Sequence, residues 1–113
     1  MVKIHIAPEA QSDLHDIKEY ITAELANPTA AINTVSKITK AIRRLIDFPD
    51  SGAPLASIVN IPNNYRFLVC GSYIVFYRHE GGIVNIVRVL YGRRDNTNIL
   101  FEDRLEDESN SEK

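Results

Sequence analysis

The first residues of the chain alternate between polar and apolar side chains. Ile4 and Ile6 fall on one face of an extended segment, and Lys3 and His5 fall on the other. This period of two is typical of a half-buried strand, which we expect over residues 2–7. Pro8 ends the strand and is well suited to the first turn of a helix.

Two longer segments carry the spacing of amphipathic helices, with apolar side chains every three or four residues. They are separated at Asn27-Pro28, because a residue that precedes proline is disfavoured in the helical conformation. So short a break predicts two antiparallel helices, a hairpin packed on a sheet. The apolar positions are Ala10, Leu14, Ile17, Ile21 and Leu25 in the first segment and Ala31, Val35, Ile38, Ile42 and Leu45 in the second.

Three strand-like runs follow a loop-rich connection, at residues 65–70, 73–78 and 83–91. Gly71-Ser72 and Glu80-Gly81-Gly82 separate them and are hairpin signals. Together the segments predict an α+β fold of order β-α-α-β-β-β, with a small antiparallel sheet, the N-terminal helical hairpin on it and a short C-terminal segment. Strict alternation along the last run predicts one face with Ile86, Arg88 and Leu90, and another with Val87, Val89 and Tyr91.

The composition fits a single domain followed by a tail. The chain has 113 residues, 44% of them hydrophobic, which suits one modest core at residues 1–101. Residues 1–101 hold 11 Lys+Arg against 9 Asp+Glu, a net charge of +2. Residues 102–113 hold 2 against 6, a net charge of −4, and we expect this acidic tail to be disordered.

Cysteine usage and hydropathy point to a cytoplasmic protein. Cys70 is the only cysteine, so an intrachain disulfide and a cysteine-based metal site are excluded. No apolar stretch approaches the roughly 18 residues of a membrane span, and we expect no membrane partner. The histidines His5, His15 and His79 lack the spacing of metal ligands, so we expect no metal and no other cofactor.

Arginine is the main cation of the three strand-like runs and the residues that follow them. Its planar fork binds carboxylates and phosphates through two hydrogen bonds, so this region predicts an anion-binding surface. A purely structural alternative remains for Arg78 and Arg88, which can serve as strand-end charges paired with Glu80, Asp95 or the acidic tail. The five arginines are Arg66, Arg78, Arg88, Arg93 and Arg94.

Three sequence motifs occur in one order, PEAQSDLHDIKEYI, YRFLVCGSYIVFYR and VRVLYGRRD. In this combination the chain resembles the RelE/ParE family of bacterial toxins from type II toxin–antitoxin modules, over about residues 2–101. The resemblance implies a cognate antitoxin that wraps the toxin in a hetero-oligomer. It also implies one of two targets. ParE-like members inhibit DNA gyrase, whereas RelE-like members cleave mRNA on the ribosome.

The family pattern assigns roles to particular residues. Arg66 and Arg94 match basic positions of the RelE-like catalytic face, whereas Leu68 and Ile74 replace a lysine and an arginine there. Tyr91 stands where many relatives have histidine. Cleavage by a 2′-hydroxyl needs a base, a group that stabilises the phosphorane and an acid.

In the nuclease interpretation Arg66 and Arg94 stabilise the transition state, and, because arginine is a poor proton carrier, the base is Tyr91, His79 or a residue of the ribosome. Arg78, Arg88 and Arg93 then bind nucleic acid or a protein partner. Because the helical hairpin is long and several catalytic residues of the family pattern are not matched, we place gyrase inhibition first and RNA cleavage second. A third possibility is a member that has lost toxicity and only binds an antitoxin. A further hypothesis places Glu106, Asp107 and Glu108 of the tail near Arg93 and Arg94.

Overall fold

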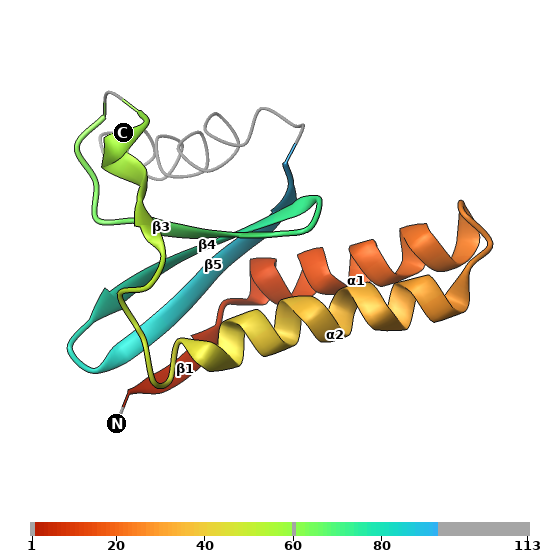
Figure 1. Cartoon of the computed structure of the whole chain (residues 1–113), viewed down its shortest axis with the longest axis horizontal. Helices are drawn as coiled ribbons and strands as arrows, with labels where there is room; N and C mark the ends of the chain where they lie inside the picture. Colours follow the sequence, from red (N-terminus) through yellow and green to blue (C-terminus); the bar gives the residue numbers. More distant parts are fainter. Residues whose placement is uncertain (1, 60, 93–113) are drawn as a thin grey trace, which may run out of the picture.

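The computed structural model describes residues 2–59 and 61–92, so the predicted C-terminal segment and tail lie outside the described residues. A strand and two helices come first, and a connection leads to three longer strands (Figure 1). The elements are β1 Lys3–Ile6, α1 Pro8–Ala23, α2 Pro28–Arg44, β2 Ala53–Pro54, a 3-10 turn at Leu55–Ser57, β3 Arg66–Cys70, β4 Tyr73–Glu80 and β5 Ile83–Tyr91.

The sheet has the strand order β1-β5-β4-β3-β2. β3, β4 and β5 are antiparallel neighbours, as the two hairpin turns predict, and β2 adds a short antiparallel pair to β3. β1 instead runs parallel to β5, with Lys3 opposite Ile83 and Ile6 opposite Ile86. The expected α+β fold is therefore confirmed, with the added detail that its sheet is mixed.

The two helices begin where their prolines permit. Pro8 and Pro28 each occupy the first turn, where a missing N–H costs no hydrogen bond. Asn27 caps α2, since its side-chain oxygen accepts the backbone N–H of Ala30 at 3.1 Å. The turn between the helices is so tight that Ala26 has a positive φ of 48°.

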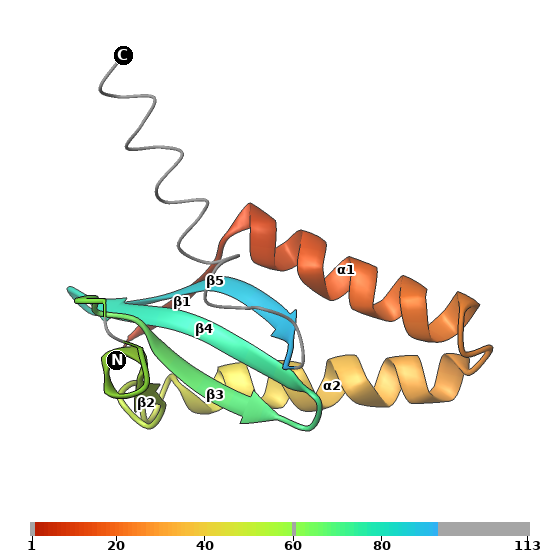
Figure 2. The same cartoon turned by 90° about the horizontal axis from the view of Figure 1, so that it is seen from above.

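The hairpin packs on one face of the sheet, and its turn projects beyond the end of the strands (Figures 1 and 2). Two clusters of buried side chains therefore form, one on each face. The first cluster lies between the helices and the sheet, and its largest buried side chain is Tyr77. The second lies on the opposite face beneath the connection from β2 to β3 and consists of Leu55, Tyr65, Phe76 and Leu90.

A β-bulge in β5 overturns the predicted alternation of that strand. Tyr77 of β4 faces Ile86 and Phe76 faces Arg88, so Val87 is an extra residue with no partner of its own. Ile86 consequently shares the first cluster with Val89, whereas Val87 packs on the second cluster with Leu90. The prediction that Ile86 and Leu90 share a face was wrong, because one inserted residue reverses the phase of a period-two pattern.

Candidate functional site

Arg66 lies at the start of β3, where its guanidinium contacts the turn that follows α2. Its Nη1 donates to the carbonyl oxygen of Gly52 at 2.7 Å and to that of Asp50 at 3.2 Å. Its Nε lies 3.6 Å from Oδ1 of the Asp50 carboxylate, and 30% of the side chain is exposed. The guanidinium of Arg66 therefore binds the turn through Nη1 and remains partly accessible to solvent.

His79 of β4 contacts the same carboxylate oxygen. Its Nδ1 lies 2.9 Å from Oδ1 of Asp50. This hydrogen bond is the main reason that the pKa of Asp50 lies below its ordinary value of 3.8; loss of hydration opposes the shift, and attraction to His79 and Arg66 adds to it. Asp50 is therefore an ionised bridge between an arginine and a histidine.

The side chain of Tyr77 contacts the same turn at Gly52. Its hydroxyl oxygen accepts the N–H of Gly52 at 2.8 Å, and burial raises the pKa of the phenol. A Cβ at position 52 would lie 2.6 Å from that hydroxyl oxygen and 2.9 Å from the carbonyl oxygen of Phe67. Only glycine fits this approach. We call the group Asp50, Gly52, Arg66, Tyr77 and His79 the Arg66 cluster.

Arg88 lies in an ion pair within the fold. Its Nε and Nη2 donate to the two carboxylate oxygens of Asp13 on α1, at 2.8 and 3.0 Å. The side chains are 20% and 12% exposed, so much of the pair is removed from water. Arg88 is thus paired with an acid, as the purely structural alternative predicts. The acid that it meets in the described residues is Asp13, however, whereas that alternative named Glu80, Asp95 or the acidic tail.

Arg78 is half-buried against an aromatic ring. Its guanidinium carbon lies 5.3 Å from the centre of the Tyr65 ring, within the range of a cation–π contact. Its Nε is buried and has no hydrogen-bond acceptor among the described residues. Arg78 therefore presents a partly desolvated cation near the end of β4.

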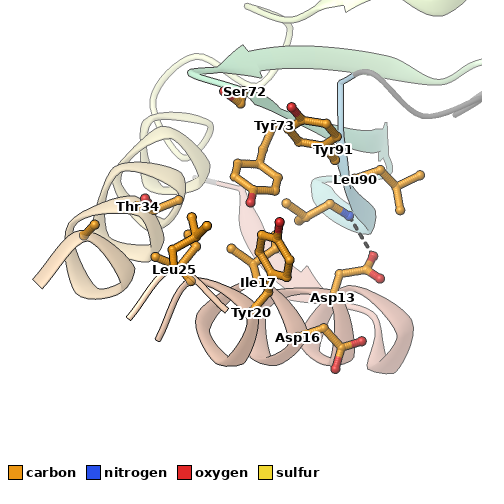
Figure 3. A pocket seen from close by; sticks show the side chains of 13 residues that line it. Asp13, Asp16, Ile17, Tyr20, Leu25, Thr34, Ser72, Tyr73, Leu90 and Tyr91 are labelled. Atoms are coloured by element: carbon orange, nitrogen blue, oxygen red, sulfur yellow. Dashed lines mark hydrogen bonds between the residues drawn. The ribbon is translucent and has the colours of Figure 1, made fainter. Parts of the chain in front are cut away.

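Tyr91 ends β5 beside a pocket between the hairpin and the sheet (Figure 3). Its ring meets Tyr73 in an edge-to-face contact with centroids 5.7 Å apart. Tyr20 of α1 turns toward Tyr73 across the pocket, and burial is the main reason that the pKa of Tyr73 is raised. Three tyrosines from α1, β4 and β5 thus line one aromatic pocket of about 670 Å³.

The predicted catalytic residues Arg66 and Tyr91 lie on different strands and are separated along the sheet. Arg66 is opposite Tyr77 on β4, whereas Tyr91 is opposite Tyr73. Four residues of β4 separate these positions, which at about 3.4 Å per residue is roughly 14 Å. Arg93 and Arg94 lie outside the described residues, so they are not placed relative to Arg66 or Tyr91.

The Arg66 cluster and the tyrosine pocket differ in the chemistry that their side chains permit. The Arg66 cluster combines a fixed cation with an imidazole, which suits an anionic ligand or a proton transfer. The tyrosine pocket suits an apolar or aromatic side chain of a partner. Sequence patterns did not single out Asp13 and Asp50, because each sits among several other acids and only the fold reveals its partners.

Some kinds of site are absent from the described part of the chain. Within residues 2–59 and 61–92, no group of three histidine, cysteine or acidic side chains is placed to hold a metal ion. In the same residues, no helix has the length and apolarity needed to cross a bilayer.

Comparison with known proteins places this architecture among the toxins of toxin–antitoxin modules. Residues 4–96 match the sequence profile of the ParE toxin of the type II toxin–antitoxin system parDE. The chain belongs to this ParE toxin family.

A solved structure shares the fold. The chromosomal ParDE toxin–antitoxin system from P. aeruginosa contains a chain that is 22% identical in sequence, with a TM-score of 0.68. The match covers 80% of the present chain and 96% of that chain. A search of curated proteins finds no match.

Proposed function

We propose that this chain is a growth-arresting toxin that binds and inhibits DNA gyrase and makes or breaks no bond itself. Membership of the ParE family supports the target. A cognate antitoxin holds the toxin inactive in a hetero-oligomer, as expected for the partner of a parDE module. Because gyrase acts on the chromosome, the proposed site of action is the cytoplasm.

The observation that carries this proposal is the separation of Arg66 from Tyr91. Catalysis requires acid, base and charge stabiliser within hydrogen-bond reach of one reacting phosphate. Two of the three residues expected to act in catalysis, Arg66 on β3 and Tyr91 on β5, lie opposite positions of β4 that are four residues apart, roughly 14 Å at 3.4 Å per residue. A protein-binding surface has no such requirement, since its contacts are spread over many side chains.

A supercoiling assay tests the proposal directly. The full-length chain, purified free of antitoxin, is expected to block supercoiling of relaxed plasmid by gyrase, and the cognate antitoxin is expected to restore it. Arg94→Ala should weaken inhibition. Arg104→Ala, an arginine of the acidic tail, is the matched control and should leave inhibition unchanged.

Induction in cells gives the opposing outcomes. Filamentation and DNA breaks with intact mRNA are expected for gyrase inhibition. Rapid loss of translation with codon-positioned mRNA cuts would instead establish the nuclease. Normal growth at good expression would favour a member that only binds an antitoxin.

RNA cleavage is kept as a second candidate because of one observation. His79 lies beside Arg66 through the shared carboxylate of Asp50, so an ionisable imidazole and a cation occur together. In that case His79→Gln should abolish mRNA cleavage while leaving the fold intact. Under the gyrase proposal the same variant should retain growth arrest.

A further inference from the structure

The charges of the helical hairpin are segregated between its two helices. α1 holds four acids, Glu9, Asp13, Asp16 and Glu19, with a single lysine. α2 holds no acid and four cations, Lys37, Lys40, Arg43 and Arg44. A solvated helix usually mixes both signs, since opposite charges four residues apart stabilise it. α2 lacks such pairs, so its charge is not explained by the helix itself.

The four cations of α2 are exposed, and none forms an ion pair with another described residue. Lys37, Lys40 and Arg44 recur at intervals of three and four, which aligns them along one stripe of the helix. From Lys37 to Arg44 the stripe extends about 10 Å, at 1.5 Å per residue. It is a continuous cationic surface that no carboxylate of the described residues neutralises in an ion pair.

A groove of about 720 Å³ runs beside this stripe, between α2 and the end of β3. The four cationic side chains form one wall, against a single acid, Asp47, and Ala41, Val69 and Cys70 contribute apolar surface. Val69 is 69% exposed, the highest value among the large apolar side chains of the described residues. Exposed apolar surface with a charged rim is typical of a binding site for protein.

The edge of β3 is open along this groove. β2 pairs only with Arg66 and Phe67, so Val69 has no strand partner on that side within residues 2–59 and 61–92. Leu55 donates its N–H to the carbonyl of Tyr65, which shows that Tyr65 turns its backbone outward. By the period of two, Val69 turns its N–H and C=O outward as well.

We propose that this groove binds an extended acidic segment of a partner protein. The cations recognise its carboxylates, Ala41 and Val69 accept an apolar side chain, and the open β3 edge pairs with its backbone. A nucleic acid would use the charges but neither the apolar surface nor the strand edge. The proposal rests on the proposed function only in naming the antitoxin as the partner that carries the segment.

Cys70 provides a built-in reporter, since it is the only cysteine and lines the groove. A short fluorescent peptide that alternates glutamate and valine serves as the probe for binding to the full-length chain. We expect saturable binding that weakens with salt, and slower alkylation of Cys70 when the peptide is bound. A peptide that alternates lysine and valine should neither bind nor protect.

Two sets of variants locate the contact. Lys37→Glu with Lys40→Glu should weaken peptide binding about tenfold or more, the loss expected for two rim charges of reversed sign. Lys3→Glu with Lys18→Glu changes the same number of exposed lysines elsewhere and should leave the affinity unchanged. Val69→Pro removes the outward N–H from an edge position where proline is tolerated, and should also weaken binding.

Equal effects of both lysine pairs would overturn the proposal, as would an unprotected Cys70. Stronger protection by duplex DNA than by the peptide would assign the stripe to nucleic acid. A dimer that dissociates in the Lys37→Glu, Lys40→Glu variant would assign the stripe to the acidic α1 of a second copy.

In cells the Lys37→Glu, Lys40→Glu variant should arrest growth without being neutralised by the antitoxin. If even the parent chain does not arrest growth, the proposed function fails while the peptide results stand.

Discussion

Asp13 of α1 and Arg88 of β5 form a two-pronged ion pair that closes the gap between the hairpin and the sheet. The carboxylate of Asp13 also accepts the backbone N–H of Val89 at 2.9 Å. β1 pairs with β5 only as far as Ile86, so this carboxylate satisfies a strand donor that β1 does not reach. One side chain thus replaces a missing residue of the neighbouring strand.

Replacing Asp13 with alanine should therefore be strongly destabilising. The change leaves a largely buried guanidinium and a strand N–H without their acceptor, and we expect a loss of about 2–3 kcal/mol in the free energy of unfolding. Urea denaturation measures it. Asp16→Ala removes an exposed carboxylate one turn away on the same helix and is expected to change stability by less than about 0.5 kcal/mol. Similar values for the two variants would contradict the proposed role of the pair.

A second prediction follows from the close contact between Gly52 and the side chain of Tyr77. Gly52→Ala places a methyl group against both the ring and the Phe67 carbonyl, and we expect a loss of about 2–3 kcal/mol. Tyr77→Phe orphans only the Gly52 N–H and should cost about 1–2 kcal/mol. Tyr73→Phe removes a half-buried hydroxyl without a hydrogen bond in the described residues and is the matched control. Thermal unfolding of the three variants should rank them in that order.

The Asp50 carboxylate predicts a pH dependence on the acid side. Its pKa is lowered in the folded state, chiefly by the hydrogen bond from His79. Its contribution to stability is therefore complete above the ordinary value of 3.8 and is lost as pH falls through the lower folded value. Asp50→Asn should unfold at lower urea than the parent near pH 6, and the difference should vanish in strong acid. Asp47→Asn, a neighbouring exposed carboxylate, should show no such convergence.

Substitutions of Tyr91 distinguish a binding role from a catalytic role, because only the catalytic role needs the hydroxyl group. If the ring acts by packing against Tyr73 in the aromatic pocket, Tyr91→Phe should keep growth arrest and Tyr91→Ala should reduce it. If the hydroxyl moves a proton to or from RNA, Tyr91→Phe should lose activity by about two orders of magnitude or more. Induction of each variant at matched protein levels, with growth and mRNA followed together, distinguishes the two.

The helices and hairpins were predictable because their signals are local. Apolar spacing and the two prolines defined α1 and α2, and Gly71-Ser72 and Gly81-Gly82 marked the turns between strands. The parallel pairing of β1 with β5 was not predicted, since partners so distant in sequence leave no local pattern. The bulge at Val87 was likewise hidden, because alternation in a run that is apolar on both faces reads equally well in either phase.

Pairing between acids and arginines was the least predictable feature of the candidate site. Arg66 and Arg88 looked alike as strand arginines, yet the former binds carbonyls of a turn and the latter a helix carboxylate. What distinguishes them is the residue that each meets from another element. The roles assigned to Arg93 and Arg94 remain predictions, because these residues lie outside the described part of the chain.

The bulge in β5 lets this strand hold one residue more than its neighbour β4 while the pairs on either side of the bulge are kept. Gly92 follows the strand directly, and its N–H bonds the carbonyl of Ser72 at 2.7 Å. Deleting Val87 would remove the extra residue and leave Arg88 opposite Phe76 and Val89 opposite Val75, so the residues that follow would keep their faces and their partners. A deletion elsewhere in β5 would instead move the residues beyond it to the other face of the sheet. Val87 is thus a position at which the length of β5 can change without a change in what the strand presents on either face.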